Sequence, residues 1–151
     1  MTEVCFRGQP DADIRESLLQ YDTATAALSP YDMREPFENS IAVDTVSLGA
    51  AMSLLNDLSW YLARTTAEVL LRDPSVSATE WLSRDLAGAI RNSEIEPAET
   101  GEYLKVYGEE NGTLLEPMYV TRRNGSIPEY DLADVEETVV VRVTSGEFER
   151  G

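Results

Sequence analysis

The sequence predicts an α+β protein in which a three-helix N-terminal bundle, built around a long central helix, precedes a small C-terminal antiparallel hairpin or meander. Between residues 10 and 92, apolar side chains recur at the spacing of helices. From residue 102 onward the period changes to two, and two Asn-Gly pairs suit the turns of hairpins. We therefore expect a helical core domain over residues 1–95 and a β-hairpin appendage with a C-terminal strand over residues 96–151.

The first helix is predicted over residues 10–28. Pro10 and Asp11 supply a start signal, and the acidic residues that follow complement the positive end of a helix dipole. Pro30 ends the helix, since it cannot continue one. Residues 29–44 hold two prolines and no sustained period, so we expect either an ordered loop or an extended arm laid on a neighbour.

The central helix is predicted over residues 45–72, where an apolar stripe is accompanied by apolar residues on other faces. Asp73-Pro74 stops it, because the residue before a proline is pushed out of the helical region. Trp60 and Tyr61 are adjacent and so point about 100° apart on a helix. One of them is expected to meet a second surface, either the sheet or another subunit.

The third helix is predicted over residues 77–92. Ser77 and Glu80 match a capping box, in which serine and glutamate satisfy backbone amides reciprocally. Arg91 places a cation at the negative end of the helix dipole. The acidic, proline-bearing residues 92–101 are typical of a linker.

The predicted strands cover residues 102–108, 114–122 and 138–144. Turns are expected at Asn111-Gly112 and at Asn124-Gly125, because this pair tolerates positive φ angles. The last strand contains an unbroken valine run, which predicts burial on both faces or packing against something else.

The charge composition is strongly acidic. The chain has 28 carboxylates, 12 cationic residues, no histidine and a formal net charge of -16, and Lys105 is its only lysine. This composition resembles that of cytoplasmic proteins from extremely halophilic archaea and their viruses. The resemblance implies concentrated salt as the solvent, where the Debye length falls to about 3 Å at about 1 M. The alternatives are a basic partner or mimicry of a nucleic acid.

The residue types exclude several chemistries. A single cysteine, Cys5, forms no intrachain disulfide, and the absence of histidine removes the usual zinc ligands. We expect Cys5 to be buried, and no glycine-rich phosphate loop occurs. No pair of carboxylates stands out as an acid and base. We therefore predict no catalytic residue, cofactor or metal site.

The sequence carries no basic and apolar leader, and no apolar run approaches the roughly 20 residues that span a bilayer. We expect a protein that is not secreted and has no membrane partner. It would act in the cytoplasm or in a virion assembled there.

Nucleic acid is not an expected partner, because Arg122-Arg123 is the only adjacent cation pair. We interpret this arginine pair instead as forming salt bridges with a neighbouring acidic subunit. The candidate interaction residues are Arg122, Arg123, Tyr119, Tyr130, Trp60, Tyr61, Val139, Val140 and Val141.

These features favour a non-catalytic structural or assembly protein that forms homo-oligomers. The three helices at 10–28, 45–72 and 77–92 with appended strands resemble the architecture of head-tail connector (adaptor) proteins of tailed viruses. The resemblance implies a ring subunit that packs against itself, a portal or tail-completion proteins, and it transfers no functional residue. The alternative is a cytoplasmic regulator, or a nucleic-acid mimic, that binds a basic partner.

Overall fold

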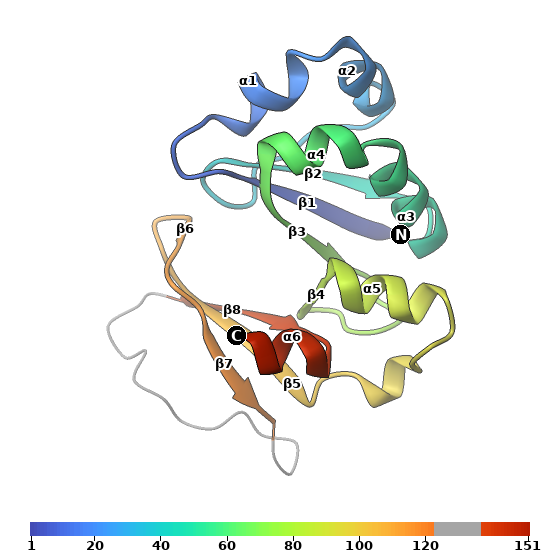
Figure 1. The fold of residues 1–151 in the computed structure, drawn as a ribbon, viewed down its shortest axis with the longest axis vertical. Coiled ribbons are helices and arrows are strands. Elements are labelled where there is room, and N and C mark those ends of the chain that lie inside the picture. Colours follow the sequence, from blue (N-terminus) through green and yellow to red (C-terminus); the bar gives the residue numbers. More distant parts are fainter. Residues whose placement is uncertain (123–136) are drawn as a thin grey trace.

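The computed structural model describes residues 1–122 and 137–151 (Figure 1). Short helices are interspersed among the strands in the first two thirds of the chain, and four strands in succession then precede the last helix. The strands are β1 Thr2–Gly8, β2 Ser40–Thr45, β3 Thr66–Arg72, β4 Trp81–Ser83, β5 Tyr103–Glu110, β6 Thr113–Leu114, β7 Met118–Thr121 and β8 Glu137–Arg142. The helices are α1 Ile14–Leu19, α2 Asp22–Leu28, α3 Leu48–Asp57, α4 Ser59–Thr65, α5 Arg84–Arg91, a 3-10 turn Pro97–Glu99, and α6 Ser145–Arg150.

The predicted helical bundle with a long central helix is wrong, because the centre of the fold is an 8-stranded sheet. The strand order is β2-β1-β3-β4-β8-β5-β6, and β7 also pairs with β5. All pairs are antiparallel except β4 with β8. Helices α1 to α4 lie over β1, β2 and β3, while α6 accompanies the C-terminal strands (Figure 1).

The segment predicted as one helix over residues 45–72 divides into β2's last residue, α3, α4 and β3. The helix ends at Thr65, whose hydroxyl donates to the Tyr61 carbonyl (2.9 Å), and β-branched Thr66 begins the strand. The following Val69-Leu70-Leu71 is buried and lies between β1 and β4. A short apolar run fits a buried strand as well as a buried helix, and in this structure the run forms part of strand β3.

The two other predicted helices are also interrupted. The helix predicted over residues 10–28 begins only at Ile14 and divides into α1 and α2, with Tyr21 between them in an extended conformation (φ -90°, ψ 121°). Ser77 does accept the Glu80 amide (3.0 Å), but the chain then continues as β4. The true cap of α5 is Ser83, whose hydroxyl accepts the Leu86 amide (3.1 Å).

The predicted strands 102–108 and 138–144 correspond to β5 and β8, while the predicted strand 114–122 divides into β6 and β7, and the pairing differs from a meander. The turn at Asn111-Gly112 is confirmed, with φ of 52° and 83° at the two residues. The turn expected at Asn124-Gly125 lies outside the described residues. Strand β8 pairs with β5 and β4, so among the described strands there is no meander. The β4–β8 pair joins the C-terminal strands to the same sheet, and the division into two domains at residue 95 stays a prediction.

The two faces of the sheet have different roles, because neighbouring residues of a strand point to opposite sides. One face packs under helices α1 to α5 and contributes residues such as Phe6 and Leu71 to the larger core. The other face carries a second apolar cluster. The tip of the β5–β6 hairpin is hydrogen-bonded to the loop before β2, because the Glu38 amide donates to the Gly112 carbonyl (2.9 Å). The sheet is therefore curved. The second face lies on the inside of the curve, and we call it the concave face.

Candidate functional site

Three aromatic rings meet at α4, of which Trp60 is exposed while Tyr21 and Tyr61 are partly buried against the core. Trp60 is 53% exposed, and its ring meets Tyr61 (5.1 Å between centroids) and Tyr21 (5.7 Å), both edge-on. Arg64 also stacks on this ring, with Cζ 3.5 Å from the centroid of the Trp60 ring. We call these four residues, Tyr21, Trp60, Tyr61 and Arg64, the aromatic patch.

Local structure holds the aromatic patch in place. Leu62 and Thr65 bury one side of α4, so Trp60 and Arg64 point outward. Arg64 Nη1 also donates to the Trp60 carbonyl (2.9 Å), which restrains the guanidinium over the indole. Tyr21 reaches the patch because it lies between α1 and α2. Tryptophan, tyrosine and arginine are the residues most enriched at energetic centres of protein interfaces.

The aromatic patch lies just after a break between two helices. Helix α3 ends at Asp57, and Leu58, with φ of -95° and ψ of 0°, both ends α3 and begins α4. Trp60 and Arg64 lie four residues apart within α4 and so share one face of that helix.

A buried ionic cluster lies on the concave face around Glu68 of β3. Its carboxylate accepts from Arg7 Nη1 (2.6 Å), from the Tyr107 hydroxyl (2.6 Å) and from Lys105 Nζ. Burial alone would raise the pKa of Glu68, but the Lys105 charge and the three hydrogen bonds outweigh burial and lower it. Burial and the Glu68 charge raise the pKa of Tyr107, so its phenol stays protonated. This cluster is an ion pair network that joins strands.

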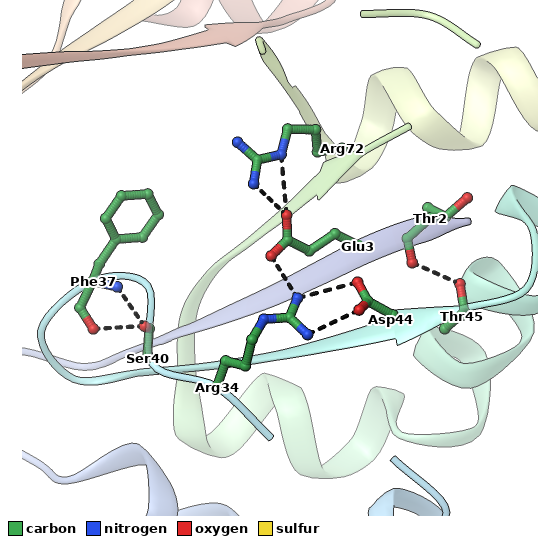
Figure 2. A network of polar contacts seen from close by, with 8 residues as sticks. All are labelled: Thr2, Glu3, Arg34, Phe37, Ser40, Asp44, Thr45 and Arg72. Atoms are coloured by element: carbon green, nitrogen blue, oxygen red, sulfur yellow. Dashed lines mark hydrogen bonds and ion pairs between the residues drawn. The ribbon is translucent and has the colours of Figure 1, made fainter. Parts of the chain in front are cut away.

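A second ionic network lies at the other end of the concave face. Figure 2 shows Glu3 between two arginines, accepting from Arg72 Nε (3.0 Å) and from Arg34 Nη2 (2.7 Å). Arg34 also holds both oxygens of Asp44 (2.9 and 3.1 Å). The network links β1, β2, β3 and the loop before β2.

Next to that network lies a cavity of about 410 Å³, which is lined by residues of β3, β4, β5 and β8. Arg72 stacks on Trp81 (4.3 Å), which also meets the ring of Phe37 (5.9 Å). Glu80 lines the cavity and accepts from Arg142 Nε (2.7 Å) and from Arg122. Burial would raise the pKa of Glu80, but the two arginines lower it. The carboxylate is therefore held ionised by groups of its own chain.

The predicted interaction residues fall in different places. Trp60 and Tyr61 meet in the aromatic patch, and Tyr119 is partly exposed on β7. Arg122 pairs with Glu80 of the same chain. Val139 and Val141 are buried in the concave cluster, Val140 is half-buried, and Arg123 and Tyr130 lie outside the described residues.

Tyr21 and Arg64 were not among the residues predicted to form an interaction surface. Arg64 had a signal, since it lies four residues after Trp60 on one helix face. Tyr21 had none, because its contact with Trp60 depends on how α1 and α2 cross α4. The ionic clusters likewise join residues far apart in the chain, such as Glu68 and Lys105.

Cys5 lies within β1 and is fully buried, as expected. Burial raises the pKa of its thiol to about 12. The thiolate, which is the nucleophilic form, is therefore scarce at neutral pH. Among residues 1–122 and 137–151, no group of three or more acidic or cysteine side chains is arranged to hold a metal ion. Within the same residues, no helix has the length and apolar character to cross a bilayer.

Comparison with known protein families gives a match over most of the chain. The model of the DUF5804 family, described as a family of unknown function, matches residues 2–109. The matched region runs from β1 to the end of β5 and includes the aromatic patch and the Glu68 cluster. No curated protein and no solved structure matches the chain.

Proposed function

Since the chain belongs to the DUF5804 family, whose function is unknown, we propose from its own structure that it is a non-catalytic assembly protein whose subunits bind one another through the aromatic patch. The exposure of Trp60 carries the proposal. A tryptophan that is 53% exposed, yet held by Tyr21, Tyr61 and Arg64, offers a large apolar surface in a fixed conformation. Burying such a preorganised side chain gains contact area at little cost in conformational entropy.

The ionic clusters support a structural role for the carboxylates of the concave face. Glu3 and Glu80 each accept from two arginines, and Glu68 accepts from Arg7 and Lys105. The pKa values of Glu68 and Glu80 are lowered, whereas a general acid at neutral pH needs a raised one. These groups are suited to fastening strands together.

The proposal is broader than the connector subunit suggested by the sequence. That resemblance depended on helices at 10–28, 45–72 and 77–92, and the chain has short helices over a sheet instead. A self-assembling subunit needs only a surface that other copies can bury. The aromatic patch supplies that surface without reference to a virion.

Salt dependence distinguishes self-assembly from binding to a basic partner. Each subunit carries a formal charge of -16, so like-charged copies repel one another in dilute buffer. At about 1 M salt the Debye length of about 3 Å removes most of that repulsion. Self-association should therefore strengthen as KCl rises.

Sedimentation equilibrium over a range of KCl concentrations tests the proposal. We expect the wild type to form dimers or larger oligomers at about 1 M KCl, where repulsion is screened. Trp60→Ala should shift it towards monomer by about 2 kcal/mol of association free energy or more, as at interface hot spots. Val46→Ala, at another exposed apolar residue, is the matched control and should behave as the wild type. A wild type that stays monomeric at every salt concentration contradicts the proposal.

An acidic groove favours one alternative function, the binding of a basic partner. Asp11, Asp13, Glu35 and Glu38 line a groove of about 480 Å³ between the start of α1 and the loop before β2. Binding of a cationic segment there would weaken as KCl rises, which is the opposite salt dependence. Titration with an oligoarginine peptide at low and high KCl, followed by calorimetry, would detect it. Glu35→Gln should reduce that binding, and Glu149→Gln, far away on α6, should not.

A further inference from the structure

Arg72 presents one oriented hydrogen-bond donor at the wall of the cavity of about 410 Å³ on the concave face. Its Nε donates to Glu3 (3.0 Å), as does Nη2 (2.5 Å), and its Cζ lies 4.3 Å from the centroid of the Trp81 ring. These contacts fix the plane of the guanidinium. In Figure 2 the remaining nitrogen, Nη1, points away from Glu3. Among the described residues Nη1 has no hydrogen-bond partner, so it is free to donate to a ligand.

Carboxylates form another wall of the cavity. Glu137, the first residue of β8, lies directly opposite Glu109 in the β5–β8 ladder, and both line the cavity. Like charges that face each other across two strands destabilise a sheet. Glu137 is exposed, and it forms no hydrogen bond or ion pair with any other described residue. A cation bound beside Glu137 would offset this repulsion.

Aromatic rings give the cavity an apolar surface. Trp81 and Phe37 both line it and are buried, with ring centroids 5.9 Å apart. Glu80 lines it as well, but Arg122 and Arg142 already pair with that carboxylate. Small-molecule pockets have volumes of about 300–1,000 Å³ and combine apolar walls with a few placed polar groups. The cavity therefore has the size and the lining of a site for a small ligand.

We propose that this cavity binds a small organic zwitterion, in which a carboxylate and an ammonium group are joined by a short apolar chain. The carboxylate accepts from Nη1 of Arg72, and the ammonium group lies beside Glu137 and Glu109. The chain between them packs against the rings of Trp81 and Phe37. The site lies on the concave face and the aromatic patch lies on α4, so the inference does not depend on the proposed function.

A ligand with a single charge fits the cavity less well. An anion could accept from Arg72, but the Glu137 carboxylate would repel it. An organic cation could lie beside Glu137, but it would displace water from Nη1 of Arg72 without supplying an acceptor, and an unsatisfied charged donor is costly. A ligand with both charges satisfies both walls at once.

Calorimetric titration of the wild type at about 1 M KCl tests the proposal with three probes that share a linear six-carbon chain. 6-Aminohexanoate carries both charges, hexanoate the negative charge alone and hexylamine the positive charge alone. We expect 6-aminohexanoate to bind about tenfold more tightly than either of the others, because each of them loses one charged hydrogen bond. Ions in direct contact are screened less than distant ones, so this preference persists in concentrated salt. Failure of 6-aminohexanoate to bind, or equal binding of hexanoate or hexylamine, would overturn the proposal.

Three variants test whether the binding takes place in the cavity. Glu137→Gln changes an exposed side chain, so the fold should be retained, and 6-aminohexanoate should bind about tenfold more weakly. Glu149→Gln makes the same change on α6, outside the lining of the cavity, and should bind as the wild type does. Arg72→Gln should lose the preference for 6-aminohexanoate over hexylamine, measured below its melting temperature. Equal affinity of Glu137→Gln and the wild type would place the binding elsewhere and overturn the site.

Discussion

Lys105 of β5 forms an ion pair with Glu68 of β3, although β4 and β8 separate these two strands in the sheet. The contact exists because the sheet curls and brings the two strands together across the concave face. Arg7 of β1 donates to the same carboxylate (2.6 Å), as does the hydroxyl of Tyr107 (2.6 Å). One glutamate therefore fastens three strands, and it uses the only lysine of the chain.

Removal of the lysine charge should destabilise the protein. The side chains of Lys105 and Glu68 are 12% and 15% exposed, and breaking a buried ion pair costs about 3–5 kcal/mol. Arg7 and Tyr107 still hold the carboxylate, so we expect Lys105→Met to lower the free energy of unfolding by about 2 kcal/mol. Denaturant unfolding at constant KCl measures the change. Lys105→Arg keeps the charge and should lose less, so equal losses in the two variants would contradict an electrostatic role.

The lowered pKa of Glu68 predicts how stability depends on pH. Its pKa in the folded protein lies below the ordinary value of 4.5, so the unfolded chain takes up the proton first as pH falls. The stabilisation is complete above the ordinary value and is lost as pH falls through the folded pKa. We expect the free energy of unfolding to be level from neutral pH to about 5 and to decrease below that.

Glu68→Gln tests the assignment of that acid transition. The variant should be less stable at neutral pH, and its stability should decrease less steeply in acid than that of the wild type. Measurements at high KCl suppress the opposing effect of protonating the many surface carboxylates. Glu99→Gln, at an exposed position, is the control and should keep the wild-type profile. Parallel profiles for Glu68→Gln and the wild type would assign the acid transition to other groups.

Local signals predicted local structure well. Asn111-Gly112 predicted a turn and forms one, because positive φ angles are a property of these two residues themselves. Pro10 and Asp11 predicted the helix start slightly too early, since the cap is Asp13, whose carboxylate accepts the Glu16 amide (3.1 Å). The strands predicted over residues 102–108 and 138–144 correspond to β5 and β8, whereas the one predicted over residues 114–122 divides into β6 and β7.

The sheet could not be predicted because its evidence is not local. Val69-Leu70-Leu71 continues an apolar helix pattern, and only pairing with β1 and β4 makes it a strand. Ser77 has the sequence of a helix cap, yet Trp81 and Leu82 are taken up by the sheet before a helix can form. The exposed Trp60 was a candidate from its position beside Tyr61, but its contact with Tyr21 required the tertiary structure.

The buried thiol of Cys5 should be unreactive in the folded protein. Cys5 lies between β2 and β3 in the sheet, and burial raises its pKa to about 12. Modification requires the thiolate and access by the reagent, and the folded state provides neither. A disulfide reagent should therefore label the protein rapidly in denaturant. In native buffer, labelling should proceed at a rate limited by unfolding, and rapid labelling would contradict the burial of Cys5.

Salt should stabilise the monomer before it promotes association. The charge of -16 on 151 residues destabilises the compact state in dilute buffer, because folding brings the carboxylates closer together. Screening at about 1 M KCl reduces that repulsion, so the melting temperature should rise steadily between about 0.1 and 1 M. Circular dichroism of Trp60→Ala measures this effect without the contribution of the aromatic patch to association. A melting temperature that does not change with KCl would contradict concentrated salt as the working solvent of the protein. It would leave a basic partner as the better explanation of the acidic surface.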